Sequence, residues 1–457
     1  MRTRRPRVAW FSPLNPDRSG ISDYSEEILP HLEAFWEPDL FVFGYRPSSP
    51  ALAHLRVVDC AVTDPVAVLH RYDAVLYHVG NSPSHEYIYE TLLRWPGLLV
   101  LHEWAIPHLV VHRTVERGRP HLYLNEMRWQ HGDAAAERGR RHLFGADPPP
   151  WDAEPLRHPL NQRVLECATG VVAHSDFVAS AARAARGDLP VFRIDHHAEP
   201  PPGCAWKGTA AGDPAAGRIV FATAGSPGLN RRVECVLRSL ARLRGELLFR
   251  YDLIGGWAGR PDLLAAVREL GLEPSVRFVG RVDLSELYRH LLAGDVCINL
   301  RHPTLGETSA IVMRALACGR PVVVSDVGWF RELPDELAVK IPPGPDEEDR
   351  LTSELSRLGA DARLRARMGE AARQWAAHRD PPSRARAYAG ALSAGGAHPA
   401  RALGRLLFQV TDTLRHIGVD ETTSLSGTAL RVTSSLRCAD WERDETHRPP
   451  RGIEPPG

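Results

Sequence analysis

Short runs of consecutive hydrophobic residues recur along the first 200 residues, and longer polar or amphipathic segments separate them. The runs predict strands at 7–11, 40–43, 74–78, 98–102 and 170–174. Their hydrophobicity is continuous rather than alternating, which is typical of strands that a parallel sheet buries on both faces. A helix is predicted to begin near Ser22, after the first strand and a loop. Residues 105–165, rich in Arg, Glu and His, predict helical excursions from the sheet.

The same pattern starts again at residue 218. It predicts strands at 218–223, 249–255, 276–279, 296–300 and 322–325, separated by helices such as 233–243 and 261–270. The stretch before it is rich in Pro, Gly and Ala without periodicity, which favours a linker. Near the end, 399–417 has the spacing of one amphipathic helix, and a polar segment ending in prolines follows it.

These patterns divide the chain into an N-terminal domain at 1–200, a linker at 201–217, a C-terminal domain at 218–377, C-terminal helices at 378–420 and a disordered tail at 421–457. The predicted fold class is α/β, with two Rossmann-like parallel-sheet domains facing a central cleft. Ligands of open α/β sheets bind beyond the carboxyl ends of the strands, so both sheets would offer binding loops to this cleft. Such an architecture suits an enzyme with two substrates.

Composition narrows the classes of function and location. Lys plus Arg and Asp plus Glu number 56 each, so no overall charge attracts the protein to nucleic acid. Lys207 and Lys340 are the only lysines, which leaves phosphate binding to arginine. The seven cysteines form no CxxC pair, and no run reaches the roughly 18 apolar residues that span a membrane. We therefore expect a cytoplasmic protein. The arginines between 113 and 142 favour a solvated face over contact with anionic lipid at a membrane surface.

The loop at 301–309 carries the most informative chemistry of the sequence. It follows a predicted strand and contains Gly306 and Glu307, and either Thr308 or Ser309 can cap the next helix. A helix start beyond a parallel strand is an anion site because its free N–H groups and dipole attract negative charge. A carboxylate beside that site would suit a ligand that also carries hydroxyls, such as a nucleotide sugar. The alternative is that Glu307 only complements the helix dipole.

Other loops offer further candidates. Gly20 precedes the first helix and would let a ligand approach the backbone, although a plain strand–helix turn explains it equally well. Arg231 and Arg232 follow a glycine-containing loop at a helix start, where two arginines predict a diphosphate clamp. His102 ends a strand at the sheet edge, where it can bind a sugar hydroxyl or serve as a structural histidine. No metal site is predicted, since His108 and His112 lack an evident third ligand.

With these residues, the chain resembles the retaining, nucleotide-sugar-dependent glycosyltransferases of the GT-B fold, group 1 or family 4. The segment 313–324, with Ala315, Cys318 and Gly319, carries the strongest resemblance, and the loop at Gly20 and the position of His102 are similar as well. The resemblance implies that Arg231 occupies the place of a diphosphate-binding lysine. It also implies a nucleoside-diphosphate sugar as substrate, no cofactor and no metal.

The sequence departs from this family at its sugar-binding glutamates. The place of the first glutamate holds Gly306, with Glu307 one residue displaced, and the place of the second holds Arg314. We expect Glu307 to reach the donor sugar if the loop shifts by one residue. The ribose contact would then be lost or made by Arg314.

The predicted function is transfer of a sugar to an unidentified acceptor, with retention and without a metal. His102 and Glu307 would be catalytic; Gly20, Arg231, Arg232, Thr308 and Ser309 would bind the donor diphosphate; Gly306 and Arg314 would contact the nucleotide or sugar. The acceptor, a glycan, a lipid-linked molecule or a small molecule, would lie on the first domain near 105–165. The alternatives are a nucleotide-sugar epimerase of GT-B-like fold and a non-catalytic protein that binds nucleotide sugars. A dinucleotide-dependent oxidoreductase is disfavoured because no GxGxxG follows the first strand.

Overall fold

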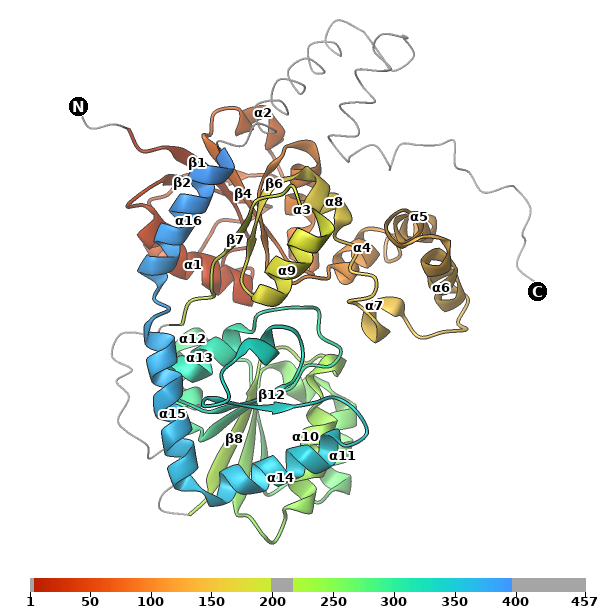
Figure 1. Cartoon of the computed structure of the whole chain (residues 1–457), viewed down its shortest axis with the longest axis vertical. Coiled ribbons are helices and arrows are strands. Elements are labelled where there is room, and N and C mark those ends of the chain that lie inside the picture. Colours follow the sequence, from red (N-terminus) through yellow and green to blue (C-terminus); the bar gives the residue numbers. More distant parts are fainter. Residues whose placement is uncertain (1–3, 199–216, 397–457) are drawn as a thin grey trace, which may run out of the picture.

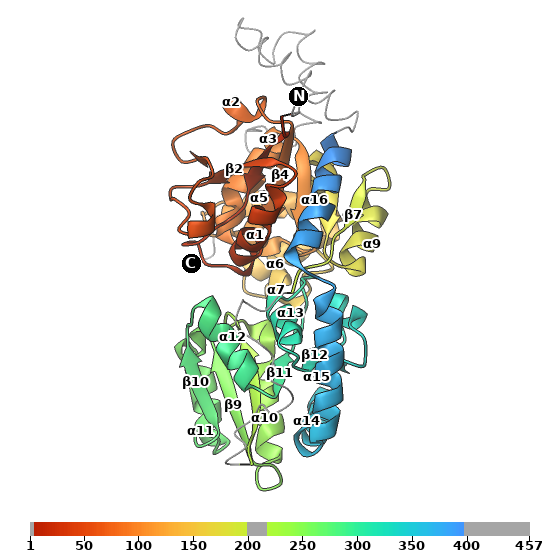
Figure 2. The same cartoon turned by 90° about the vertical axis from the view of Figure 1, so that its left-hand side faces the viewer.

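The computed structural model describes residues 4–198 and 217–396. Two α/β domains lie one above the other along the long axis of the molecule (Figures 1 and 2). The predicted helix at 399–417, the predicted tail at 421–457 and most of the predicted linker lie outside the described residues.

The first domain contains a sheet of seven parallel strands in the order β3-β2-β1-β4-β5-β6-β7. Its strands are β1 Arg7–Phe11, β2 Glu37–Val42, β3 Val57–Asp59, β4 Ala74–Val79, β5 Gly97–Leu101, β6 Ala168–Ala173 and β7 Val191–Arg193. The connecting helices are α1 Gly20–Leu32, α2 Val66–Leu69, α3 Glu86–Arg94, α8 Gln162–Cys167 and α9 Asp176–Ala185, with short 3₁₀ turns at Pro50–Leu52 and Pro83–His85. The central strands are buried on both faces, as continuous hydrophobicity predicted.

The second domain contains a parallel sheet of six strands in the order β10-β9-β8-β11-β12-β13. The strands are β8 Ile219–Ala224, β9 Phe249–Ile254, β10 Val276–Gly280, β11 Val296–Asn299, β12 Val322–Ser325 and β13 Ala338–Ile341. Its helices are α10 Val233–Arg242, α11 Pro261–Glu269, α12 Leu284–Ala293, α13 Ala310–Ala317, α14 Glu347–Ala360 and α15 Ala362–Ala377, with 3₁₀ turns at Leu229–Arg231, Gly256–Gly259 and Gly328–Glu332.

The two Rossmann-like domains predicted from the sequence are confirmed. The strands that the pattern missed are β3, β7 and β13, which each lie at the edge of a sheet and span three or four residues. Runs this short give no clear hydrophobic pattern. The first helix begins at Gly20 rather than near Ser22, because the Ser19 hydroxyl accepts the Ser22 N–H and caps it.

The last described helix returns the chain to the first domain. α16, Pro381–Gly396, follows α15 of the second domain and lies beside α1 (Figure 2). Its Tyr388 and Leu392 are fully buried in a core that includes Trp10 and Tyr24. The Tyr24 and Tyr388 hydroxyls are 3.0 Å apart and hydrogen-bonded. The core of the first domain is therefore completed by residues that follow the second domain in the sequence.

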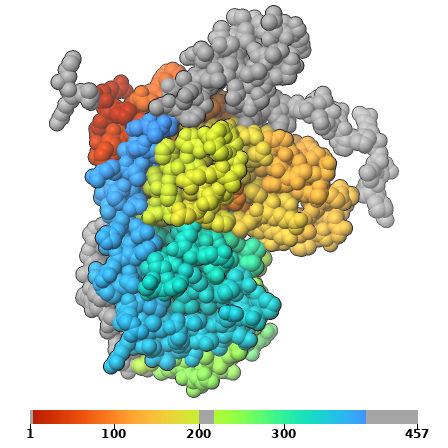
Figure 3. All heavy atoms as spheres, viewed as in Figure 1, coloured from red at the N-terminus to blue at the C-terminus, as the bar shows by residue number. Residues whose placement is uncertain are grey.

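Residues 105–165 form helices beside the first sheet, as the composition predicted. They are α4 Pro107–Arg113, α5 Pro120–His131, α6 Asp133–Leu143 and α7 Pro150–Ala153, and they project sideways from the domain (Figures 1 and 3). A separate small core holds them together, with Val110, Tyr123, Met127 and Leu160 buried. We name this unit, residues 105–161, the helical arm.

The described helices include none that is long and apolar enough to cross a membrane. The cysteines within the described ranges are free thiols, and four of the five are buried.

Truncating Leu392 tests the contribution of α16 to the first domain. We expect Leu392→Ala to lower the free energy of unfolding by about 2–5 kcal/mol, because it opens a cavity in a packed core. Arg386→Ala, on the exposed side of the same helix, should change it by less than about 0.5 kcal/mol. Urea denaturation followed by tryptophan fluorescence measures both, and equal effects of the two variants would contradict the assignment of α16 to this core.

Candidate active site

A cleft of about 1150 Å³ lies between the two domains. It is lined by loops that follow the carboxyl ends of strands in both sheets and by the end of the helical arm. The predicted site residues that line it are Gly20, His102, Arg231, Arg232, Glu307, Thr308, Ser309 and Arg314. Tertiary structure thus brings together residues from segments that lie almost 300 positions apart in the sequence.

Two helix N-termini meet at this cleft. Ser19 caps α1, and the Ser309 hydroxyl accepts the Val312 N–H at 3.3 Å and caps α13, for which the sequence offered Thr308 or Ser309. A Cβ atom on Gly20 would lie 3.7 Å from the Ala310 Cβ, so the two helix starts are in van der Waals range of each other. Their free N–H groups and positive dipole ends favour an anion between the domains.

Arg231 adds a cation to the same wall of the cleft. It lies in the loop between β8 and α10, beside the backbone of Gly225. No described residue accepts a hydrogen bond from its guanidinium, and its buried NH1 has no partner. A half-buried arginine without a carboxylate is costly unless a ligand supplies the negative charge. The loop is fixed against 301–309, since the His302 N–H donates to the Asn230 carbonyl at 2.8 Å.

Arg232 lies in the same loop but has a protein partner. Its guanidinium forms an ion pair and hydrogen bonds with the buried carboxylate of Glu347 at the start of α14. The predicted clamp of two arginines therefore presents a single unpaired guanidinium to a ligand, that of Arg231. Arg232 anchors the loop.

The side chain of Glu307 is held within its own loop. One carboxylate oxygen accepts hydrogen bonds from the Thr304 hydroxyl and the Leu305 N–H, both at 2.8 Å. The other lies 2.9 Å from Nε of Arg301, which is almost fully buried. Glu307 thus faces the cleft with a fixed orientation and a neutralised charge.

Glu103 is a second carboxyl beside Glu307, and sequence reasoning did not select it. Burial raises the pKa of Glu103 to about 8; the negative charge of Glu307 adds to this shift and the positive charge of Arg301 opposes it. Its Oε2 is inaccessible to solvent and has no hydrogen-bond partner in the described structure. At neutral pH this carboxyl is therefore protonated and can donate a hydrogen bond. Its position directly after His102, at the end of β5, was the available signal.

His102 reaches the cleft from the carboxyl end of β5, as predicted. Its Nε2 is 2.8 Å from Nδ1 of His78, so only Nδ1 is left to meet a ligand. Burial, with the neighbouring histidines, lowers the pKa of His102 well below its usual value. The ring is therefore neutral and can bind a hydroxyl, but it is a weak base.

Gly306 lies outside the cleft lining and joins the domains instead. Its φ of +78° is in the left-handed region, and a Cβ there would come within 2.7 Å of the Trp104 Cβ and 2.8 Å of the Phe177 ring. Next to it, the Ala105 N–H donates to the Leu305 carbonyl at 2.9 Å. Glycine here allows the 301–309 loop to pack directly on the first domain.

Arg314 also joins the domains. Its guanidinium is almost fully buried and binds the Glu27 carboxylate on α1 at 2.8 Å, with Asp23 3.8 Å away. Burial opposes the charge, but these carboxylates outweigh it and raise the pKa of Arg314. The second oxygen of Glu27 binds Nε2 of His197. The residue in place of the family's second glutamate thus forms an interdomain ion pair.

The histidines His108 and His112 have different partners. His108 binds Asn81 and Asp152, whereas His112 binds Glu116 and lies near Glu86. Within the described ranges, no group of three His, Cys, Asp or Glu side chains is placed to hold a metal ion.

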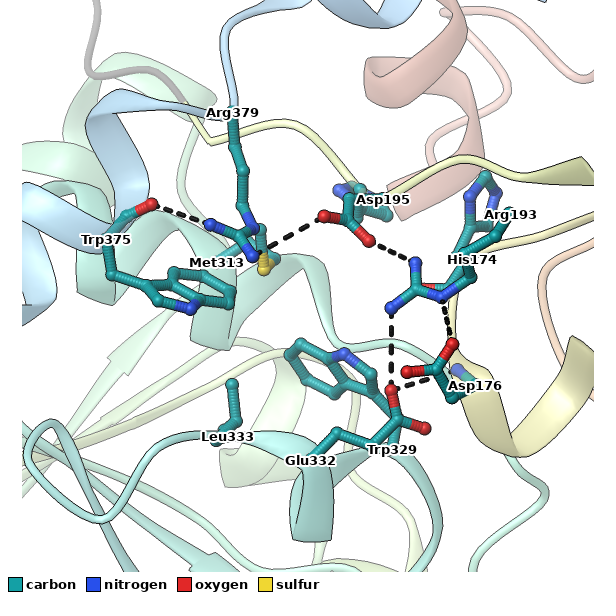
Figure 4. Close-up of a pocket in the computed structure, with 11 residues that line it drawn as sticks. His174, Asp176, Arg193, Asp195, Met313, Trp329, Glu332, Leu333, Trp375 and Arg379 are labelled. Atoms are coloured by element: carbon teal, nitrogen blue, oxygen red, sulfur yellow. Dashed lines mark hydrogen bonds and ion pairs between the residues drawn. The ribbon is translucent and has the colours of Figure 1, made fainter. Parts of the chain in front are cut away.

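A second pocket, of about 320 Å³, lies at the same domain junction (Figure 4). Arg193 stands at its centre, with Nε 3.1 Å from Asp176, NH2 3.5 Å from Glu332 and a further contact to Asp195. Arg379 lies 3.4 Å from the other oxygen of Asp195. The charged groups of this pocket are paired with one another, and the contacts of Glu332 with Arg193 and with the start of α9 join the two domains.

The basic residues between 113 and 142 are mostly paired with acidic ones. The ion pairs are Arg113–Glu90, Arg117–Glu86, Arg128–Asp133, Arg138–Glu154, Arg140–Glu137 and Arg141–Asp147. This part of the helical arm therefore presents mixed charge, which favours the interpretation as a solvated face.

Comparison with known proteins agrees with this geometry. Residues 217–361 match the family model described as "Glycosyl transferases group 1". The matched residues cover most of the second domain. No curated protein matches the chain at a significant level.

Solved structures extend the likeness to both domains. HepE from Anabaena, in complex with UDP, is 17% identical and aligns over 85% of this chain and 100% of its own, with a TM-score of 0.57. Sucrose-phosphate synthase from Thermosynechococcus elongatus is 16% identical over 90% of this chain and 100% of its own, with a TM-score of 0.56. A glycosyltransferase from Rickettsia africae is 11% identical over 84% and 96%, with a TM-score of 0.53. At these identities the likeness establishes the GT-B fold. Together with the family match over residues 217–361, this likeness confirms the expectation that the protein is a glycosyltransferase.

The raised pKa of Glu103 predicts a pH-dependent stability. The folded protein keeps this proton up to about pH 8, whereas the unfolded chain loses it near pH 4.5. The contribution of Glu103 to the free energy of unfolding therefore falls as pH rises from 5 to 8, by on the order of 1 kcal/mol per pH unit. Glu103→Gln should remove this slope, which urea unfolding at several pH values measures.

The control for this series is Glu336→Gln, at an exposed position of the second domain. It should leave the slope of the wild type unchanged. Parallel curves for Glu103→Gln and the wild type would contradict the protonated state of Glu103.

Proposed function

We propose that this glycosyltransferase moves a sugar from a nucleoside-diphosphate sugar to an acceptor hydroxyl, with retention and without a metal. The observation that carries the proposal is the unpaired guanidinium of Arg231 in a cleft where the N-termini of α1 and α13 meet. This arrangement concentrates positive charge from three independent sources at one place. A diphosphate is the anion that fits a cation flanked by two helix starts.

The proposed step breaks the bond between the anomeric carbon and the diphosphate oxygen and forms a bond from that carbon to the acceptor oxygen. The acceptor proton passes to the leaving diphosphate, whose developing charge Arg231 and the helix dipoles stabilise. The carboxyls of the donor region support transfer without a side-chain base: Glu307 is held by Arg301, and Glu103 is protonated. The lowered pKa of His102 makes it a poor base as well. Proton transfer to the leaving group on the same face accounts for retention.

His102 and Glu307 would hold the sugar in this proposal. Nδ1 of His102 is left for a sugar hydroxyl, because Nε2 is bound to His78. Glu307 and the protonated Glu103 would present an acceptor and a donor of hydrogen bonds side by side. Arg314 would not replace the ribose contact of the second glutamate, since Glu27 already binds it.

Nucleotide binding tests the role of Arg231. We expect Arg231→Ala to weaken UDP binding roughly 10- to 100-fold, the usual effect of losing one or two charge-assisted hydrogen bonds. Isothermal titration calorimetry with UDP, GDP and ADP measures the dissociation constants. Arg238→Ala is the matched control, because Arg238 lies on α10 outside the cleft and pairs with Glu348. Equal affinity in Arg231→Ala and the wild type would overturn the diphosphate site.

Turnover tests the reaction itself. UDP-glucose is the first donor to examine, because HepE was solved in complex with it. We expect UDP release that depends on an added acceptor and persists in EDTA, and a product with the anomeric configuration of the donor, as read by NMR. An inverted product or loss of activity in EDTA would refute retention or metal independence respectively. An altered sugar nucleotide formed without acceptor would identify an epimerase, and UDP binding without turnover over a panel of donors and acceptors would identify a binding protein.

A further inference from the structure

The end of the helical arm lines the same cleft as the donor residues. Pro148, Pro149, Trp151, Asp152 and Pro155 face the cleft from the segment around α7. In Figure 3 the arm projects beside the boundary between the two domains. The residues of the second domain that are proposed to bind the diphosphate do not form this side of the cleft.

A fixed chain of hydrogen bonds orients Asp152. The Leu109 N–H donates to the amide oxygen of Asn81 at 3.1 Å, so the Asn81 amide nitrogen faces His108 and donates to its Nδ1 at 2.7 Å. His108 is therefore protonated on Nε2, which donates to one carboxylate oxygen of Asp152 at 2.9 Å. Both ring nitrogens are occupied, so His108 orients Asp152 and is no base.

The other oxygen of Asp152 is left free. No described residue donates a hydrogen bond to Oδ2, and the side chain is 51% exposed. An exposed ion pair of this kind contributes little to stability. The arrangement instead presents a fixed hydrogen-bond acceptor to the cleft.

Trp151 supplies a rigid aromatic surface next to this acceptor. Its ring is perpendicular to those of Tyr123 on α5 and His142 on α6, with centroids 5.4 and 4.6 Å away. Tyr123 is fully buried in the core of the helical arm. Across the cleft, Leu229 is 74% exposed in the loop that carries Arg231. Apolar surfaces on both sides and a carboxylate on one side match a molecule with hydroxyls along its edge and C–H groups on its faces.

We infer that Trp151 and Asp152 form the acceptor subsite and that the acceptor is a neutral saccharide. This inference rests on the proposed function, because an acceptor subsite has a role only if the protein transfers a sugar. Asp152 accepts a hydrogen bond from a saccharide hydroxyl that does not react, and the sugar ring packs on Trp151. The free carboxylate would repel an anionic acceptor such as a lipid phosphate.

Binding can be measured without turnover. Saturation-transfer NMR uses methyl glycosides of glucose, galactose, mannose and N-acetylglucosamine with the full-length protein saturated with UDP, and decyl phosphate serves as the anionic lipid probe. We expect at least one glycoside to bind, with its dissociation constant raised tenfold or more in Asp152→Asn and in Trp151→Ala. UDP affinity should change less than twofold in both, which also shows that they fold.

The helical arm provides matched controls. Asp133→Asn and Phe144→Ala change exposed residues of the arm that lie outside the cleft, and both should bind the glycoside like the wild type. His108→Gln, which can still donate to Asp152, should retain more binding than His108→Ala. Binding of decyl phosphate alone, binding of no glycoside, or glycoside binding unchanged in Asp152→Asn and Trp151→Ala would each overturn the inference.

Turnover separates this inference from the proposed function. If the wild type binds the glycoside through Trp151 and Asp152 but consumes no donor, the proposed function fails and the saccharide site remains. If the wild type transfers sugar and Asp152→Asn leaves the KM for the acceptor unchanged, the proposed function remains and the subsite fails.

Discussion

The ion pair between Arg314 and Glu27 is the contact on which the cleft depends. Arg314 projects from α13 of the second domain and is almost fully buried, so it requires a partner, and α1 of the first domain supplies one. The pair joins these two helices beyond their first turns, and at the first turns themselves Gly20 faces Ala310. Two positive helix ends oppose one another unless an anion lies between them. By joining α1 to α13, the ion pair helps to bring together the two helix ends between which a ligand phosphate is favourable.

The loop at 301–309 shows how one segment serves both domain packing and chemistry. Gly306 turns the backbone so that it packs on Trp104, and the neighbouring Glu307 is thereby brought beside Glu103 of the first domain. Arg301 neutralises Glu307, while burial keeps Glu103 protonated. Arg301 forms its ion pair with Glu307, and its positive charge does not overcome the effect of burial on the pKa of Glu103. A cleft with one charged acceptor and one neutral donor can orient sugar hydroxyls without providing a strong base.

The helical arm adds a wall that the two sheets alone would lack. The arm has its own core, and an ion pair at 2.6 Å between its Glu126 and Arg163 of α8 fixes α5 against α8. The residues that reach the cleft lie at its end, around α7. The proposed donor and acceptor surfaces therefore come from separate parts of the chain.

The sequence by itself determined the central strands, the two-domain fold and a helix cap at Thr308 or Ser309, because continuous hydrophobic runs and capping side chains act over a few residues. It also indicated the loops at Gly20, Arg231 and Glu307 as the candidate donor site, because loops after parallel strands gather at one sheet edge. It could not assign partners across the domains. Only the tertiary structure decided that Arg232 and Arg314 are bound by Glu347 and Glu27, that Arg231 is unpaired, and that Glu103 is protonated. The ion pairs and the pKa of a side chain depend on groups that are distant in the sequence and that folding brings within a few ångströms. The local sequence pattern does not indicate which groups these are.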